Sequence, residues 1–142
     1  MTRLVPPNPT AAPVTAAGED GSTFPLAPMA ARLCERYFTA YPDDGERLGS
    51  VGWLWCEHDS RHLLAWGLQD ARTHDLDCVE RVAWLARVLA ARGFPLERLA
   101  CHVGWTAEVL TSSGLGPLGA RAGERMDAAA RALGQPGVDR EV

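Results

Sequence analysis

The stretch ERLGSVGWLWCEHDSRHLLAWGLQDA, residues 46–71, decides the fold. When successive residues are turned by about 100°, its side chains form the apolar stripe that is typical of an amphipathic helix. That stripe carries Leu48, Val51, Trp55, Trp66 and Gln69. Trp53, Leu64 and Leu68 fall on the opposite side. Apolar residues on two faces indicate the central helix of a bundle, or a helix that also contacts a partner subunit.

Shorter segments with helical spacing lie on both sides of this stretch. We expect further helices at residues 28–41, 76–92, 96–111 and 118–133. No stretch alternates apolar and polar residues with β-branched enrichment, so we expect no strands. Short connections favour antiparallel neighbours. The sequence therefore predicts an all-α fold, a four- to five-helix antiparallel bundle over residues 28–134.

The residues between these segments suggest where the helices begin and end. Pro42 and the sequence Asp43-Asp44-Gly45 predict a turn before the long helix. Asp77, three residues before Glu80, resembles the start of a capping box, although Asp75 is an alternative cap.

The two ends of the chain lack this pattern. Residues 1–27 are rich in Pro, Ala, Thr and Gly and contain few large apolar side chains. Such a segment buries too little surface to offset its loss of conformational entropy, so we expect a disordered N-terminal tail. Residues 135–142 are expected to fray.

Composition limits the class of protein. The 142 residues carry a formal net charge of −4, and the 14 basic residues are all arginine. A negative chain without a basic cluster argues against nucleic acid as a partner. The apolar runs are too short for a bilayer, and the prolines near the N-terminus interrupt any secretory signal. We expect no membrane association, a cytoplasmic protein, and reduced thiols at its four cysteines.

Asp59 and His62 form the most unusual polar pair in the chain. They lie three residues apart on the stripe that also carries Trp55 and Trp66, so their side chains could touch. One interpretation is a buried polar network, in which they pair with each other, an arginine or a tyrosine. A second is a site that senses a ligand or a proton. A catalytic dyad is a third, but no positioned nucleophile accompanies it, so we predict no enzymatic activity.

Scattered histidines and cysteines raise the question of a metal. His58 and His62 have the spacing of two ligands on one helical face, as do His74 and Cys78. Cys56 and the pair Cys101-His102 add further donors. No carboxylate-and-histidine motif of the E-x-x-H type is present, and isolated His and Cys more often fill the core. We therefore predict neither a metal site nor a bound cofactor.

Two of the five tryptophans point away from the main apolar stripes. Trp53 and Trp84 are therefore the candidate interface residues. Together with the two-sided pattern of residues 46–71, they predict contact with a protein partner or with a second copy of the chain.

Residues 41–110 resemble an uncharacterised bacterial helical module that occurs alone or beside cobalamin-binding and other sensory domains. The resemblance rests on Cys56-x-x-Asp59-x-x-His62-Leu63, one residue shorter than the module's pattern, and on Tyr41-Pro42 and the stretch from Val82 to Gly93. It implies a sensory or regulatory accessory domain and no reaction. The tryptophan-spacer-Glu-His pattern of light-sensing cobalamin bundles is missing.

These observations favour a non-enzymatic, self-associating helical module for regulation or protein interaction. The alternative is a helical bundle that binds a small molecule, a tetrapyrrole or a metal. That alternative would use Asp59, His62, Trp55 and Trp66 as its ligand-binding face.

Overall fold

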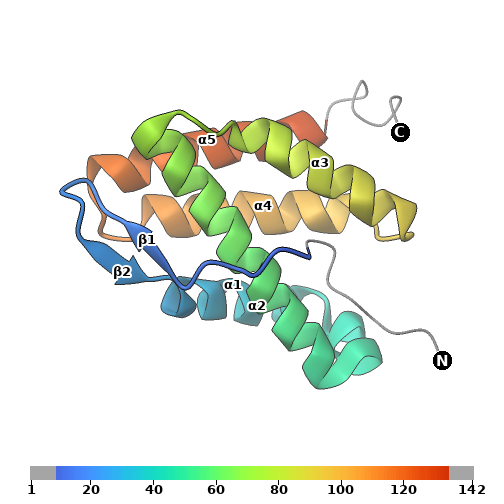
Figure 1. Cartoon of the computed structure of the whole chain (residues 1–142). Helices are drawn as coiled ribbons and strands as arrows, with labels where there is room; N and C mark the ends of the chain where they lie inside the picture. The colour runs from blue at the N-terminus through green and yellow to red at the C-terminus, as the bar shows by residue number, and fades with distance from the viewer. Residues whose placement is uncertain (1–8, 135–142) are drawn as a thin grey trace.

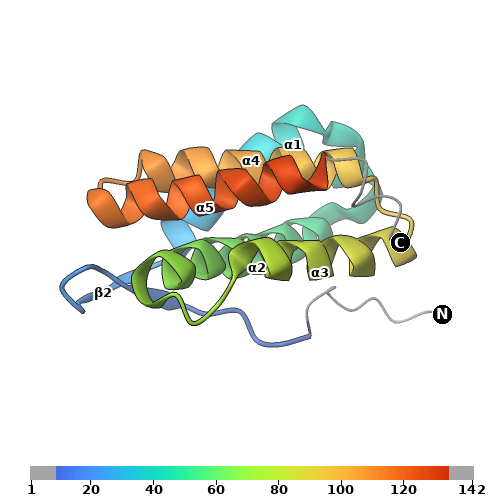
Figure 2. The ribbon, with the colours of Figure 1, turned by 90° about the horizontal axis from the view of Figure 1, so that it is seen from above.

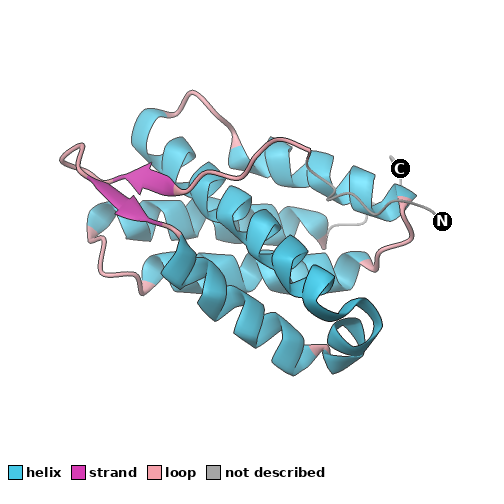
Figure 3. Cartoon of the chain, turned by 60° about the horizontal axis from the view of Figure 1, so that its bottom comes forward, coloured by secondary structure: helices cyan, strands magenta, loops and turns pink. Residues whose placement is uncertain are grey.

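The computed structural model describes residues 9–134, and the predicted all-α class is confirmed within them. The elements, in chain order, are β1 (Thr15–Ala17), β2 (Thr23–Pro25), α1 (Ala27–Ala40), α2 (Pro42–Thr73), α3 (Cys78–Ala91), α4 (Leu96–Thr111) and α5 (Pro117–Leu133). Five helices thus make up most of the described chain, and the strands form one small sheet (Figures 1 and 3).

The helices pack in two layers. Seen from above, α4 and α5 run side by side in one layer with α1 next to them, and α2 and α3 form the other layer (Figure 2). Helix α2 crosses its neighbours diagonally and contacts all four other helices (Figure 1). The two-sided apolar pattern of residues 46–71 therefore reflects a central helix.

The core lies where α2 crosses α4 and α5. Leu63, Leu64 and Leu68 of α2 are almost completely buried there. Each such side chain contributes roughly 1.5 to 3 kcal/mol when fully removed from water. Gly67 allows the close crossing, because a Cβ atom at this position would lie 3.1 Å from Leu110 Cδ1. An alanine at this position would require the side chains of Leu110 and Met126 to shift.

The start of α2 differs from the prediction. A turn was expected at residues 43–45, but the chain is helical from Pro42 and bends at Gly49 instead. Proline suits a first helical position. Asp43 and Asp44 lie in the first turn, where the positive end of the helix dipole interacts favourably with their negative charges. Gly49 has φ 63° and ψ −144°, a region that is essentially restricted to glycine. This bend turns residues 42–48 out of line with the rest of α2.

The N-terminal boundary also differs, because β1 and β2 form an antiparallel hairpin in which Ala16 lies opposite Phe24. The expectation of no strands was wrong here. Local turn chemistry explains the hairpin, since the Asp20 carboxylate accepts a hydrogen bond from Ser22 N at 3.0 Å. Leu26, which follows β2, is completely buried. Residues 9–26 lose conformational entropy when they become ordered, and contacts with the helices offset this loss. Composition alone does not reveal such contacts.

Residues 1–8 of the predicted tail, and the whole of the predicted frayed end at 135–142, lie outside the described residues. Within residues 9–134, no helix combines the length and apolar character that a membrane crossing requires.

The C-terminal end of α2 is fixed by a carboxylate network. The Asp70 side chain accepts a hydrogen bond from Cys78 N at 2.9 Å and contacts Arg125 Nε at 3.1 Å. Asp77 caps α3 by accepting from Val79 N at 3.0 Å, which decides between the two cap candidates. Asp75 instead accepts hydrogen bonds from side chains of the preceding turn. Asp70 thereby joins α2, α3 and α5.

Candidate functional site

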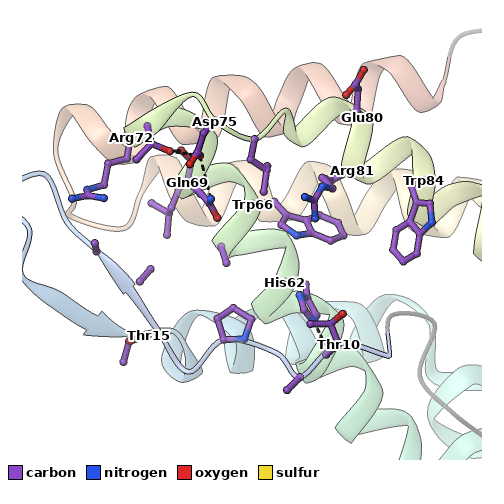
Figure 4. A pocket seen from close by; sticks show the side chains of 18 of the residues that line it. Thr10, Thr15, His62, Trp66, Gln69, Arg72, Asp75, Glu80, Arg81 and Trp84 are labelled. Atoms are coloured by element: carbon purple, nitrogen blue, oxygen red, sulfur yellow. Dashed lines mark hydrogen bonds between the residues drawn. The ribbon is translucent and has the colours of Figure 1, made fainter.

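One hollow in the described chain is a groove between the N-terminal segment, α2 and α3. We call residues 9–17 the arm and this hollow the arm groove. It has a volume of about 1300 Å³ and is open to solvent. His62 and Trp66 of α2 form its floor, the arm is one wall, and Arg81 and Trp84 of α3 belong to the other (Figure 4). The groove therefore joins segments that are distant in sequence.

Side chains of α2 hold the arm in place. His62 Nε2 donates a hydrogen bond to the Thr10 carbonyl at 3.0 Å (Figure 4). Arg61 Nη1 lies 3.3 Å from the Pro13 carbonyl. Burial lowers the pKa of His62, opposed by this hydrogen bond and assisted by the neighbouring His58. His62 is therefore neutral at pH 7, and its Nε2–H serves as a clamp on the arm rather than as an acid.

The walls of the arm groove carry more positive than negative side chains. Arg72, Arg81 and Arg87 line it and are exposed. Two carboxylates, Asp75 and Glu80, stand against these three arginines, and hydrogen bonds from Thr73 and Gln69 lower the pKa of Asp75 and keep it charged. In a chain of net charge −4, this groove is thus a local site of positive charge.

A second, smaller cavity lies at the other end of α2. We call it the Asp59 cavity. Its volume is about 450 Å³, and it is lined by residues of α1, α2, α3, the α3–α4 turn and α4. Most of the wall is apolar, formed by Phe38, Leu48, Trp55, Leu63, Leu85, Leu89, Phe94 and Leu99. The bend at Gly49 places residues 43–48 against it.

Asp44, at one side of the Asp59 cavity, has all the partners that a buried carboxylate requires. It accepts a hydrogen bond from the Tyr37 hydroxyl at 2.5 Å and forms ion pairs with Arg47 at 2.8 Å and Arg98 at 3.1 Å. Burial and this hydrogen bond raise the pKa of Tyr37, so its hydroxyl stays protonated and donates. The network ties α1, α2 and α4 together.

Asp59 is the contrasting carboxylate in the same cavity. Its Oδ1 atom is covered from solvent and has no hydrogen-bond partner among the described residues. Burial raises the pKa of Asp59 to about 7, against the opposing charge of Arg92. An unpaired buried oxygen is costly, because a group removed from water normally needs a replacement for its hydrogen bonds.

The four predicted ligand-binding residues therefore separate into two sites. Trp55 and Asp59 line the Asp59 cavity, whereas His62 and Trp66 line the arm groove. No hydrogen bond or ion pair joins Asp59 to His62, and the backbone carbonyl that His62 uses instead was not among the expected partners. One helical stripe faces both hollows because α2 is packed on several sides.

The predicted interface tryptophans also separate. Trp84 lines the arm groove. Trp53 is half-buried and stacks on Phe38 of α1, with ring centroids 5.9 Å apart. Trp53 thus has an intramolecular partner, and Trp84 is the better candidate for contact with another molecule.

A serine–histidine pair was missed by the sequence analysis. Ser60 Oγ lies 2.9 Å from His102 Nε2, 42 residues away in the chain. The pair has the geometry of a nucleophile and a base, but Ser60 is completely buried and burial lowers the pKa of His102 to about 4. A general base is most effective with a pKa near the working pH. We therefore assign the pair to the contact between α2 and α4. No sequence signal could have found it.

The candidate metal ligands do not converge. Among residues 9–134, no group of three or more His, Cys, Asp or Glu side chains is placed to hold an ion. The rings of His58 and His62 lie 4.8 Å apart, but no third ligand joins them. The four cysteines are free thiols.

Comparison of the chain with protein-family models, with curated proteins and with solved structures found no match.

Proposed function

We propose that the protein is a non-enzymatic interaction module that binds an extended, acidic segment of a partner protein in the arm groove. The observation that carries this proposal is the groove itself, about 1300 Å³ in volume and open to solvent. Small-molecule sites are typically smaller and mostly enclosed, with volumes of about 300 to 1000 Å³. The size and openness of the arm groove favour a polypeptide.

The walls of the groove support an extended partner. Strand β1 pairs with β2 along one edge, and Thr15, Ala16 and Ala17 of β1 line the groove. No described residue of β2 lines the groove, and among the described residues the other edge of β1 has no strand partner. An extended peptide can add to such an edge through main-chain hydrogen bonds.

The side chains of the groove support acidic character in that partner. Trp84 offers a large, partly exposed ring, and tryptophan is among the residues that most often anchor protein interfaces. Arg81 and Arg87 flank it on the same helix, one turn away on either side. Arginines in this position would pair with carboxylates and would speed association.

A defined peptide pair tests the proposal. The probe is a fluorescein-labelled peptide of alternating Glu and Val, and its counterpart has Lys in place of Glu. We expect fluorescence anisotropy to show saturable binding of the acidic peptide alone. Trp84→Ala should weaken that binding by about tenfold, as is usual for a central interface tryptophan. Arg81→Glu should also weaken binding of the acidic peptide, and the loss of affinity should be larger at low salt than at high salt.

Arg32→Glu is the matched control for charge. Arg32 is exposed on α1, lies outside the groove and undergoes the same reversal of charge. Equal affinity for the acidic and the basic peptide, or equal losses from Arg81→Glu and Arg32→Glu, would contradict the proposal.

Self-association is a second candidate, supported by a different surface. Val51 and Leu54, one turn apart on α2, are 39% and 62% exposed, and neither lines the arm groove. Light scattering after gel filtration measures the mass directly. A mass of one chain at all concentrations would exclude this candidate and would leave the groove proposal intact.

A further inference from the structure

The Asp59 cavity contains a carboxylate oxygen for which the described chain supplies no partner, in a space large enough for a ligand. Its volume of about 450 Å³ falls in the range of small-molecule sites, unlike that of the arm groove. We propose that the Asp59 cavity binds a small, mainly apolar amine, whose ammonium group pairs with Asp59 and whose apolar part lies against Trp55 and the leucines.

The cavity is lined by three aspartates and three arginines, so its charges are balanced in number, and it is the hydrogen bonding that points to a missing donor. Asp44 and Asp43 are already paired with Arg98, at 3.1 Å and 3.0 Å. Arg47 is also engaged by Asp44. Asp59 Oδ1 differs because it is buried and has no hydrogen-bond partner among the described residues, although the charge of Arg92 acts on this carboxylate. A ligand N–H group is what this oxygen lacks.

The remaining polar groups around the cavity do not compete for that donor. His102 is neutral because burial lowers its pKa to about 4, and its Nε2 is engaged by Ser60. The Tyr37 hydroxyl donates to Asp44. The Cys56 thiol stays protonated, because a hydrogen bond with Cys34 and burial raise its pKa. Asp59 is thus the acceptor left for a ligand.

The apolar wall selects against ions that are mainly hydrophilic. Leu63, Leu85 and Leu99 are nearly completely buried, and Phe94 and Leu48 complete the lining. An aromatic or branched aliphatic group of an amine would remove this surface and its own surface from water. A cationic ligand over the face of Trp55 would gain a further attraction. Within residues 9–134, no group of three or more His, Cys, Asp or Glu side chains is placed to hold a bare metal ion there.

The test uses phenethylamine as probe at pH 8, where both Asp59 and the amine are mainly charged. Phenethyl alcohol and phenylacetate are its neutral and anionic comparators. We expect the amide signals of residues 52–63 and 92–99 in two-dimensional NMR to shift saturably with the amine. We expect the alcohol to bind at least about tenfold more weakly and phenylacetate not at all, because only the amine supplies a charged donor.

Two variants localise the site. Asp59→Asn keeps the shape of the side chain and should raise the Kd for phenethylamine at least about tenfold, because one partner of the buried charge pair is lost. Leu89→Phe should weaken binding by narrowing the cavity without a change in charge. Asp127→Asn is the matched control, since Asp127 is exposed and pairs with Arg131 on the surface of α5.

The outcomes that overturn the proposal are distinct. No saturable shift with any of the three probes would mean that water alone fills the cavity. Equal affinity for the amine and the alcohol, or an unchanged Kd in Asp59→Asn, would show that Asp59 is not the counter-ion. None of these results bears on peptide binding in the arm groove, which involves other residues.

Discussion

Asp70 and Asp59 lie on the same helix, about three turns apart, in opposite environments. Asp70 accepts from Cys78 N and Arg125, and these partners hold its pKa below the usual value although burial alone would raise it. Asp59 Oδ1 has no such partner, and burial raises its pKa to about 7. Burial therefore has opposite consequences for a carboxylate, depending on whether the fold supplies donors.

The difference separates a part of α2 whose buried carboxylate is paired from a part whose carboxylate has an oxygen with no partner among the described residues. The network of Asp70 connects three helices and leaves no acceptor in need of a donor. The region of Asp59 combines a cavity, a bend at Gly49 and an unpaired oxygen. Natural proteins tolerate such a locally unfavourable group mainly where it takes part in function.

The largest effect is expected from Asp70→Ala. The variant removes two charge-assisted hydrogen bonds and leaves Cys78 N and Arg125 without their acceptor, so the free energy of unfolding should fall by about 3 kcal/mol. Because the folded pKa of Asp70 is lowered, its contribution is present at neutral pH and is lost as the pH falls through that pKa. Urea denaturation at pH 7 and pH 3, followed by tryptophan fluorescence, measures both effects.

Asp127→Ala serves as the control for Asp70→Ala, because its side chain is exposed on α5. A surface ion pair contributes at most about 1 kcal/mol. Similar losses in the two variants would mean that Asp70 is not the link between α2, α3 and α5.

The second effect is a gain in stability, expected from Asp59→Asn, in contrast to the loss expected from Asp70→Ala. The folded pKa of Asp59, about 7, lies above its ordinary value of 3.8, so the folded state holds a proton that the unfolded state loses between these values. The stability of the parent protein should therefore decline from pH 4 to pH 7 because of this group. Asp59→Asn has no ionisable group at this position. Its free energy of unfolding, relative to that of the parent protein, should therefore rise by roughly 2 kcal/mol between pH 5 and pH 8.

Urea denaturation of Asp59→Asn and the parent protein at pH 5 and pH 8 checks this sign. The groups that face the Asp59 cavity, namely Tyr37, Asp43, Asp44, Arg47, Cys56, Arg92, Arg98 and His102, are the same in both proteins. If the two proteins differed in free energy of unfolding by the same amount at both pH values, or if Asp59→Asn were the less stable at pH 8, the contrast between Asp59 and Asp70 would be wrong.

The smallest effect concerns the bend that separates residues 42–48 from the rest of α2. Gly49→Ala forces an L residue into a glycine region, although a Cβ atom would meet no neighbour there. We expect a loss of about 1 kcal/mol from backbone strain alone. Gly104→Ala is the matched control, because Gly104 lies in α4 with equally open space around it. That change should be neutral or stabilising, since alanine favours a helix.

Thermal denaturation of the two alanine variants distinguishes backbone strain from a general effect of alanine. Gly49→Ala should also weaken phenethylamine binding, because residues 43–48 form part of the Asp59 cavity. Equal melting temperatures for the two variants would indicate that the bend is not under strain.

The helical periodicity of the sequence predicted α4 with the observed bounds and α3 and α5 within a few residues, because amphipathic spacing is a local property. The start of α2 was harder to predict. Pro42 reads equally as the end of one helix and the first residue of the next, and only packing decides between them. The hairpin was missed because its strands have three residues each and are stabilised by contacts with distant helices.

The four residues predicted to bind a ligand remain a prediction, and the structure shows only where they lie. Asp59, His62, Trp55 and Trp66 do line hollows, yet they serve two different ones. The partners that separate them are Thr10, which is 52 residues from His62 in the chain, and the wall of the Asp59 cavity. A pattern on one helix shows which side chains share a stripe, but not what packs on each side of it.

The sequence by itself determined the helical class, the order of the helices, and the presence of a carboxylate and a histidine on the apolar stripe of the central helix. These properties follow from local spacing and from the chemistry of single residues. The tertiary structure decided that Asp70 is satisfied and Asp59 is not, and that the arm becomes a wall of a groove. Hydrogen bonding and burial depend on atoms brought together from distant parts of the chain, so spacing within one helix cannot determine them.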